Sequence, residues 1–199
     1  FEDLKKIVKK YDIGTIKMEV ASRGNLPNKK FLKKVQSFAK KKKIILIFDE
    51  CTSGFRRNFG GLHLALKLKP DIAMYGKALG NGFAITAVLG NKKVMAAAEK
   101  SFISSTFWTE RVGYVAAINT LNEMKRMQSW KVLIRNGKHI NQCWKNLAKK
   151  HKLDIKIEGI ESITSFRFLS KFNVEYKTFI AQEMLKKGYL ASNLIYINI

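Results

Sequence analysis

The sequence predicts an α/β protein with a mainly parallel sheet, followed by a smaller α+β unit. Strand-like and helix-like stretches alternate at short intervals through about residue 100, as in sheets built from parallel strands. Residues 44–48 (IILIF) are all apolar, which is typical of a strand buried on both faces. From Thr109 onward, long helical patterns and grouped strands replace the alternation. We therefore expect a first unit at 1–125 and a second unit at 126–199.

The first unit opens with an expected strand at 15–20 (TIKMEV), and a turn-like stretch at 22–28 follows it. A helix is expected to begin at Pro27 and Asn28. Its apolar residues are spaced for one helical face: Phe31, Leu32, Val35, Phe38 and Ala39. The elements expected after the 44–48 strand are a short helix near 62–68, a strand at 72–75, a strand within 84–90 and a short helix within 91–100.

The second unit is expected to pair two long helices with short strands. In chain order its expected elements are helices at 110–127 and 129–150, strands at 153–159 and 162–169, and a helix at 174–187. Apolar residues at helical spacing in the first of these helices are Val112, Val115, Ala116, Leu121 and Met124. Gly188 follows the last helix and is typical of the residue just beyond a helix end.

Composition narrows the class of protein. The chain has 199 residues and a hydrophobic fraction of 46%, which is enough to build a core. No apolar run is long enough for a membrane span. Two cysteines are too few for a disulfide framework or a zinc cluster, so we expect reduced thiols, a cytoplasmic protein and no metal site. The chain begins without Met and ends in an apolar, strand-like run, which we interpret as an internal piece of a longer protein.

The net charge of +23 raises the hypothesis of a nucleic-acid-binding protein. The excess is mostly lysine, spread over the polar faces of helices, without an arginine-rich stripe interleaved with aromatic residues. The densest run, at 40–43, ends a helix, where cations interact favourably with the helix dipole. Nucleic-acid binding therefore stays a disfavoured alternative.

Residues that can carry chemistry follow the expected strands. Asp49 and Glu50 come directly after the 44–48 strand, and Lys77 comes after the 72–75 strand, beside glycines. A hydroxyl-rich run at 104–106 precedes a long helix. Ligands of α/β sheets bind beyond the carboxyl ends of the strands. A phosphorylated ligand with a basic nitrogen and a carbonyl would use an acid, a lysine and hydroxyl groups together, and pyridoxal phosphate is such a ligand.

Three motifs in this order resemble one enzyme family. They are FDECTSGFR (48–56), the stretch 59–90 that contains YGKALGNG, and SSTFWTER (104–111). Together they are similar to the class III (subgroup II) pyridoxal-phosphate-dependent aminotransferases, and most similar to the glutamate-1-semialdehyde aminomutase branch. The separation of Asp49 and Lys77 (77 − 49 = 28) fits the family pattern. The resemblance implies a fold-type-I transferase, with part of the large cofactor-binding domain followed by an incomplete small C-terminal domain.

The resemblance also implies roles for individual residues. Lys77 matches the lysine that forms the Schiff base with pyridoxal 5′-phosphate and then acts as general base. Asp49 matches the aspartate that pairs with the nitrogen of the cofactor ring. The protonated ring nitrogen would then be the cation that compensates the charge of Asp49. Cys51 stands where a small residue packs on the ring, and Glu50 is given a supporting role. Thr106 matches the threonine that binds the phosphate of the partner subunit's cofactor, so a homodimer is implied.

The implied activity is transfer of an amino group between a small-molecule amino donor and an aldehyde or keto acceptor. An intramolecular amino shift, as in the aminomutase branch, is the alternative. Two departures leave the substrate open: Glu19-Val20 stands where relatives have Glu-Pro, and FWTER (107–111) replaces a glycine-rich stretch. The phosphate loop and ring-stacking aromatic of the family normally lie before Phe1, and the carboxylate-binding arginine after Ile199. We therefore expect this piece alone to be inactive.

Each candidate also has an ordinary structural interpretation. Lys77 would be a solvated surface lysine, Asp49 would cap a helix or pair with Arg56 or Arg57, and Thr106 would cap a helix.

Other polar and aromatic residues are expected to be structural. His63 is interpreted as a structural or surface histidine and not as a catalyst. Arg111 either meets a substrate carboxylate or only begins a helix. Packing is the expected role of the tryptophans Trp108, Trp130 and Trp144.

Overall fold

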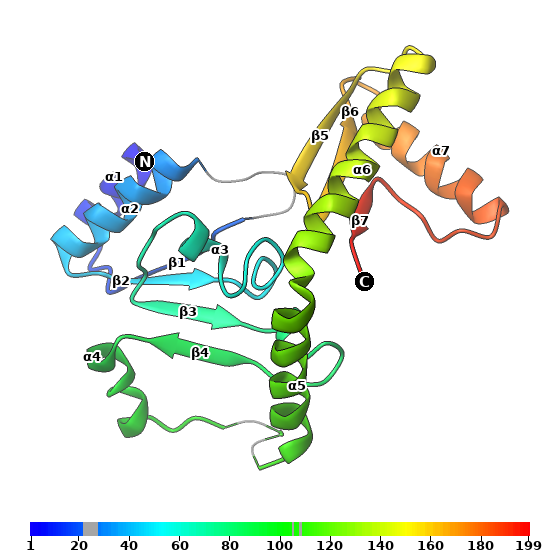
Figure 1. The fold of residues 1–199 in the computed structure, drawn as a ribbon. Coiled ribbons are helices and arrows are strands. Elements are labelled where there is room, and N and C mark those ends of the chain that lie inside the picture. The colour runs from blue at the N-terminus through cyan, green and yellow to red at the C-terminus, as the bar shows by residue number, and fades with distance from the viewer. Residues whose placement is uncertain (22–27, 105, 108) are drawn as a thin grey trace.

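The computed structural model describes residues 1–21, 28–104, 106–107 and 109–199. Its elements form a four-stranded sheet and a three-stranded sheet, joined by two long helices (Figure 1). In chain order the elements are α1 (Glu2–Lys10), β1 (Thr15–Glu19), α2 (Lys29–Lys42), β2 (Ile45–Asp49), α3 (Leu62–Ala65), β3 (Ile72–Tyr75), the 3₁₀ turn η1 (Lys77–Leu79), β4 (Ala87–Gly90), α4 (Lys92–Met95), the 3₁₀ turn η2 (Ala98–Lys100), α5 (Arg111–Met127), α6 (Ser129–Lys150), β5 (Ile155–Ile160), β6 (Ile163–Phe168), α7 (Asn173–Lys186) and β7 (Leu194–Tyr196).

The first sheet has the order β1-β2-β3-β4. β1, β2 and β3 run parallel, with Asp49 of β2 opposite both Glu19 of β1 and Met74 of β3. β4 runs antiparallel to β3, so the expected mainly parallel sheet is confirmed with one reversed edge strand. Because the three parallel strands point the same way, their carboxyl ends meet at one edge of the sheet.

The helix expected after Asn28 is confirmed as α2. The Asn28 side chain accepts a hydrogen bond from the Lys30 backbone N–H, which caps the first turn. Its buried residues Leu32, Val35 and Ala39 belong to one hydrophobic cluster with Leu46 and Phe48 of β2. The turn expected at 22–28, including Pro27, lies largely outside the described residues.

The expectation that the β2 strand is buried on both faces is only half right. Leu46 and Phe48, on the face packed against α2, are buried, whereas Ile45 and Ile47 on the other face are half-buried. Residues of α1, α2 and α3 all join the cluster that contains Leu46 and Phe48. These helices therefore cover the same face of β2.

α6 has the expected bounds, α5 begins one residue later than expected, and Gln128 separates the two helices in a left-handed conformation (φ 48°). α5 buries Gly113 and Ala117, whereas Val112 and Val115 are 50% and 57% exposed. Leu121 and Met124 pack against the cluster that contains Ala117, so the expected apolar side is confirmed in the later turns of the helix and wrong at Val112 and Val115. Gly113 explains the difference, because a Cβ there would lie 2.9 Å from the Ala84 carbonyl oxygen.

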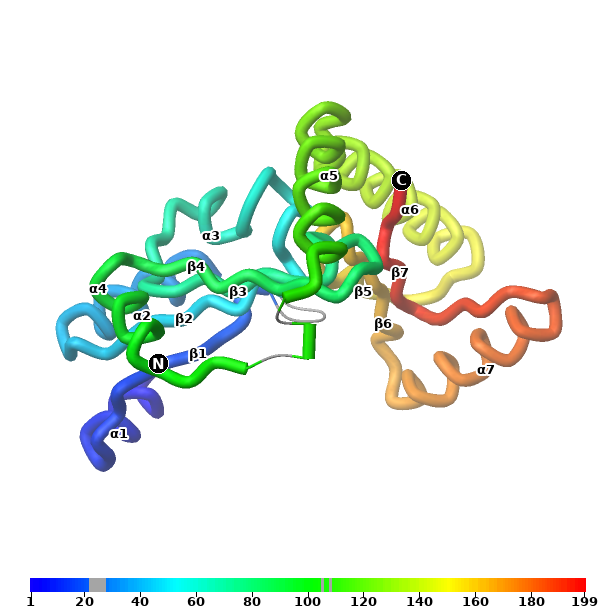
Figure 2. Tube along the Cα trace, turned by 90° about the horizontal axis from the view of Figure 1, so that it is seen from below, coloured from blue at the N-terminus to red at the C-terminus, as the bar shows by residue number. Residues whose placement is uncertain are grey.

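The second sheet has the order β5-β6-β7, with antiparallel pairing throughout. α1 and α7 lie at opposite ends of the molecule in both views (Figures 1 and 2). α7 ends before Gly188, whose φ of +83° confirms the expected helix stop. Ile160 and Ile163 of the second sheet join the cluster around Leu46, so the two sheets share a core. The boundary between 125 and 126 stays a prediction.

Membrane insertion was not expected from the apolar runs. In the described ranges, no helix has both the length and the apolar character to cross a bilayer.

A substitution at Gly137 tests the junction of the two units. A Cβ on Gly137 of α6 would lie 1.8 Å from the Glu161 carbonyl oxygen in the β5–β6 turn. We expect Gly137→Ala to lower the free energy of unfolding by about 2–3 kcal/mol, measured by urea titration. Gly14→Ala is the matched control, because nothing lies within 4 Å of a Cβ there, and it should change stability by less than about 1 kcal/mol. Equal effects of the two substitutions would contradict the close approach.

Candidate active site

Asp49 and Lys77 lie at the same edge of the first sheet. Asp49 is the last residue of β2, and Lys77 follows β3 after Gly76. The Glu50 backbone N–H donates to the Met74 carbonyl at 2.8 Å, so the β2–β3 pairing continues to the strand ends. Parallel pairing therefore brings together two groups that are 28 residues apart in the sequence (77 − 49 = 28).

The Asp49 carboxylate has two partners. Oδ2 lies 2.9 Å from Lys17 Nζ of β1, and Oδ1 accepts the Cys51 backbone N–H at 3.0 Å. Burial acts to raise the pKa of Asp49, but the hydrogen bonds from Lys17 and Cys51 outweigh it and lower the pKa of this carboxyl below its ordinary value. Asp49 is therefore ionised at neutral pH, with only 16% of its side chain exposed.

Lys17 is a partner that sequence reasoning missed. The expected cation for Asp49 was a ring nitrogen, and the ordinary alternative was Arg56 or Arg57. In the structure the Asp49 carboxylate pairs with Lys17, so the Arg56 or Arg57 alternative is wrong. The pairing of Asp49 with a ring nitrogen stays a prediction. Lys17 lies opposite Ile47 in the parallel register, two residues before Glu19 on the same face of β1. The sequence feature that could have indicated this pair is the single lysine within the strand-like stretch TIKMEV. Only the register of the sheet, however, connects that lysine to Asp49.

Lys77 begins η1 with a left-handed backbone (φ 46°), which is unusual for a residue with a side chain. Its Nζ donates a hydrogen bond to Thr52 Oγ1 at 2.7 Å, and the residue is exposed. Thr52 belongs to the turn that follows β2. The amine of Lys77 is thus held beside the end of the neighbouring strand.

Cys51 lies among the charged groups of this edge. Burial raises the pKa of its thiol, the hydrogen bond and charge of Asp49 raise it further, and the charges of Lys77 and Lys17 act in the opposite direction. The thiol is therefore neutral at neutral pH. A Cβ added at Gly76 would lie 3.5 Å from Cys51 Sγ, which is an ordinary van der Waals contact, so the thiol lies against the strand end that leads to Lys77.

Glu50 faces away from this site and is fully buried. Its Oε1 accepts the His63 backbone N–H at 2.8 Å and lies 2.8 Å from His63 Nδ1, while the Ser53 hydroxyl donates to Oε2. Burial acts to raise the pKa of Glu50, but the hydrogen bonds from His63 and Ser53 outweigh it and lower the pKa. The structural interpretation of His63 is confirmed, because His63 binds Glu50 and so holds the buried side of the turn after β2.

A cavity of about 730 Å³ opens beside Lys77. Its wall includes Arg56 from the turn after β2, Asn119 and Glu123 from α5, and Tyr196 of β7. The cavity therefore lies between the first sheet, the long helix and the second sheet, at the carboxyl ends of the parallel strands.

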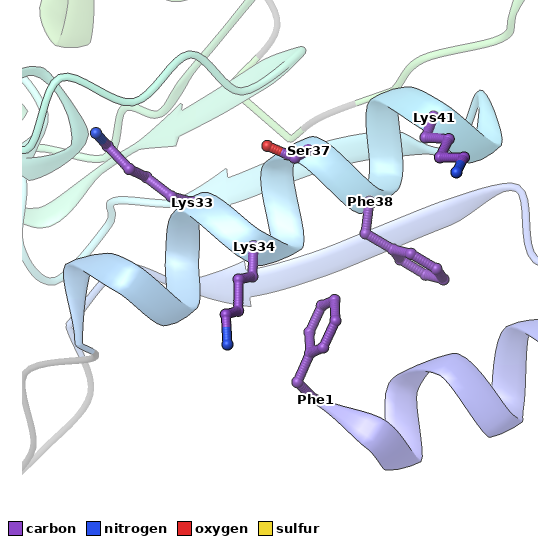
Figure 3. Close-up of a pocket in the computed structure, with 6 residues that line it drawn as sticks. All are labelled: Phe1, Lys33, Lys34, Ser37, Phe38 and Lys41. Carbon is purple, nitrogen blue, oxygen red and sulfur yellow. The ribbon is translucent and has the colours of Figure 1, made fainter.

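A second hollow lies between α1 and α2 (Figure 3). It measures about 370 Å³ and is lined by Phe1, Lys33, Lys34, Ser37, Phe38 and Lys41. The rings of Phe1 and Phe38 meet edge to face at 5.7 Å. Its wall has no acid to act with the lysines, and it lies on helices rather than at the strand ends, so it is a weaker candidate for catalysis.

The remaining candidates lie at the start of α5 or in packing positions. Thr106 lies in an exposed turn, and the residue that caps α5 is Glu110, so the helix-cap interpretation of Thr106 is wrong. Arg111 is the first residue of α5. Trp130 packs on Phe59 at 5.8 Å and Trp144 on Phe166 at 4.9 Å, which confirms their packing role. Trp108 lies outside the described residues.

Residues 5–194 match the family model of the class-III aminotransferases. The chain belongs to this family. It is 40% identical over 208 residues to glutamate-1-semialdehyde 2,1-aminomutase of Nitrosopumilus maritimus, covering 94% of this chain and 49% of that protein. It is 38% identical over 135 residues to 3-aminobutyryl-CoA aminotransferase of Cloacimonas acidaminovorans, covering 67% of this chain and 33% of that protein.

Solved structures share the fold of this class-III aminotransferase chain. The FumI protein of Sphingopyxis sp. MTA144 superposes with a TM-score of 0.88 at 23% identity, covering 97% of this chain and 48% of that one. A β-phenylalanine aminotransferase from Variovorax paradoxus gives 0.86 at 17% identity, covering 100% and 51%. The expected fold is therefore confirmed. The chain spans about half the length, or less, of the relatives that it matches.

Pyridoxal 5′-phosphate is the cofactor of this family. The groups at the sheet edge fit it. The ionised Asp49 carboxylate suits a protonated ring nitrogen, and the exposed Lys77 amine suits an aldehyde. The neutral Cys51 thiol suits the uncharged face of a ring.

The buried Glu50 gives a stability prediction with a pH dependence. We expect Glu50→Gln to lower the free energy of unfolding by about 3 kcal/mol at pH 7, because His63 and Ser53 lose an ionised partner. The folded pKa of Glu50 is lowered, so its contribution is full above the ordinary value of 4.5 and is lost as the pH falls through the folded value.

The difference between wild type and variant should therefore shrink below about pH 4, measured by urea titration across pH. Glu183→Gln, which removes an exposed pair with Lys186, is the control and should cost less than about 1 kcal/mol. A pH-independent loss in Glu50→Gln would contradict the role of its charge.

The ion pair at Asp49 gives a second prediction. Lys17→Met should raise the pKa of the Asp49 carboxyl, because it removes the hydrogen bond and the charge that lower it. The measurement is an NMR titration of the side-chain carboxyl carbons. Lys5→Met, which removes a similar exposed pair with Glu2, is the control and should leave Asp49 unchanged. An unshifted Asp49 in Lys17→Met would show that the pair does not form in solution.

Proposed function

We propose that the protein containing this chain transfers an amino group between a small-molecule amino donor and an aldehyde or keto acceptor, with pyridoxal 5′-phosphate as cofactor. One observation carries the proposal: Asp49 and Lys77 lie at the ends of adjacent parallel strands, and the neutral Cys51 thiol is near enough to feel both charges. Membership of the class-III aminotransferases supports the same activity.

Each residue of the edge has a chemical task in this proposal. Bound pyridoxal phosphate supplies a carbonyl that condenses with amines and a ring that accepts the electron pair released at the substrate carbon. The Asp49 carboxylate would accept a hydrogen bond from the ring nitrogen and so keep that nitrogen protonated. The Lys77 amine would hold the cofactor and, as a free amine, would serve as the general base that removes and returns the proton at the substrate carbon.

Several neighbouring groups position these two. Thr52 holds the Lys77 amine through a 2.7 Å hydrogen bond, and the Cys51 backbone N–H orients Asp49. Glu50 and His63 support the turn that carries Cys51 and Thr52. The side chain of Cys51 would pack on the ring. Its small neutral thiol adds no charge next to the reacting atoms.

The assembly and location belong to the same proposal. We propose a homodimer in which Thr106 binds the phosphate of the partner subunit's cofactor, which suits its exposed turn. We also propose a cytoplasmic protein, since Cys51 and Cys143 are free. The large domain would end near residue 125 and the small domain would follow it.

An intramolecular amino shift is the second candidate activity. It is supported by the 40% identity with the aminomutase of Nitrosopumilus maritimus over 94% of this chain. The two activities differ in their requirement for a second substrate. An intramolecular shift needs only one substrate. Amino transfer needs two, so it gives an aminated product only after a carbonyl acceptor is added.

Removal of Lys77 tests the proposal. In the full-length protein, borohydride reduction should fix pyridoxal phosphate onto the tryptic peptide that contains Lys77, detected by mass spectrometry. Lys77→Ala should abolish this label and lower kcat for amino transfer by at least about 10³-fold, because the general base is lost. Lys92→Ala, at the exposed start of α4, should keep both the label and the activity. A label on another lysine, or full activity in Lys77→Ala, would contradict the proposal.

A further inference from the structure

Lys17 brings a cation to the carboxylate that would hold the ring nitrogen of the cofactor. Its Nζ lies 2.9 Å from Asp49 Oδ2, and its side chain is 56% exposed. The register of β1 on β2 sets Lys17 opposite Ile47, so Asp49 is its diagonal neighbour on the same face of the sheet. The lysine therefore extends along the sheet to the acid that ends β2, although water is open to it.

Both oxygens of the Asp49 carboxylate already accept a donor. Oδ1 accepts the Cys51 backbone N–H at 3.0 Å, and Oδ2 lies 2.9 Å from Lys17 Nζ. A carboxylate has about four lone-pair sites, so a ring N–H still fits, but it shares an oxygen with one of these donors. By ordinary hydrogen-bond lengths, a ring nitrogen bound to Asp49 would lie within roughly 8 Å of the Lys17 ammonium.

The charges of Lys17 and Asp49 act on each other. Burial acts to raise the pKa of the Asp49 carboxyl, whereas the hydrogen bond and charge of Lys17 act to lower it. The hydrogen bond and charge of Asp49 raise the pKa of Lys17 in turn, so the ammonium keeps its proton at neutral pH. A carboxylate neutralised by one ammonium attracts a second cation less, and the two cations repel each other.

The other titratable groups near Asp49 act differently. Glu19 lies opposite Asp49 on β1, and its charge acts to raise the pKa of Lys17. The Cys51 thiol is neutral at neutral pH, because burial and Asp49 raise its pKa. Lys77 would hold the aldehyde carbon of the cofactor, which is on the opposite side of the ring from the nitrogen. Within the described ranges, Lys17 is therefore the cation placed to act on the ring nitrogen.

We propose that Lys17 weakens the hold of Asp49 on the proton of the cofactor's ring nitrogen, and so limits how strongly the ring withdraws electrons from the substrate carbon. The inference rests on the proposed amino transfer and adds a positioning residue from β1 to it. A protonated ring nitrogen makes the ring the stronger electron acceptor. Lys17 acts through Asp49, so its effect is seen first in the titration of that nitrogen.

The test follows the ring nitrogen and not turnover. The full-length protein and its variants are loaded with pyridoxal phosphate that carries nitrogen-15 in the ring, because the NMR chemical shift of this atom differs between its protonated and unprotonated forms. The shift is recorded as the pH is raised. In Lys17→Met the nitrogen should lose its proton about one pH unit higher than in wild type, which is a tenfold change in proton affinity. Lys17→Arg keeps the charge and should titrate close to wild type.

Lys156→Met is the matched control. Lys156 is also a strand lysine paired with an acid, 54% exposed and 3.6 Å from Glu158, but it lies in β5 of the second sheet. Its replacement should leave the titration of the ring nitrogen unchanged. Equal titration in wild type and Lys17→Met, or a wild-type nitrogen that stays protonated over the whole pH range, would overturn the inference.

Asp49→Asn separates this inference from the proposed function. It removes the carboxylate that would hold the ring proton, so the nitrogen should be unprotonated at pH 7. If Asp49→Asn removes the proton but Lys17→Met shifts nothing, the inference fails and the proposed function stands. If wild type takes up no pyridoxal phosphate at Lys77, or Asp49→Asn leaves the nitrogen protonated, the proposed function fails, and the inference fails with it.

Discussion

The parallel register of β2 on β3 is the constraint on which the site depends. It sets Asp49 opposite Met74 and ends both strands at one edge, so a carboxylate and an amine from separate strand ends arrive together. A slip of one residue would turn Asp49 to the opposite face of the sheet. The same register on the other side of β2 brings Lys17 within 2.9 Å of Asp49. One edge thus gathers an acid and two lysines.

The turn after β2 serves two purposes at once. Its buried side is held by Glu50, whose carboxylate is accommodated only because His63 and Ser53 donate to it. Its exposed side carries Cys51, Thr52 and Arg56 toward the strand edge and the cavity. The buried network therefore determines the positions from which the exposed groups act. This explains why two adjacent acids, Asp49 and Glu50, have opposite environments: one faces the site and one anchors it.

Local patterns predicted much of this fold. The apolar spacing from Phe31 to Ala39 gave α2, and the stretch IAMY gave β3 with its observed bounds. The residues of the site edge, Asp49 and Lys77, were found because each directly follows a strand. α1 was not expected, although Glu2 and Asp3 at its start and Lys9 and Lys10 at its end complement a helix dipole.

What sequence reasoning missed depends on contacts between distant segments. The first turn of α5 packs through Gly113 against Ala84 and not through its neighbours Val112 and Val115. Lys17 and Arg56 are single cations in a lysine-rich chain, and nothing local distinguishes them. Lys17 reaches Asp49 through the register of β1 on β2. Arg56 lies near Lys77 because both side chains bind Thr52.

The central claim is that one cofactor ring meets both Asp49 and Lys77. A crystal structure of the full-length protein with pyridoxal phosphate tests it most directly. The account predicts that the cofactor is attached to Lys77 and that its ring nitrogen lies within hydrogen-bonding distance of an Asp49 carboxylate oxygen. A ring bound at another lysine, or one whose nitrogen faces away from Asp49, would contradict it.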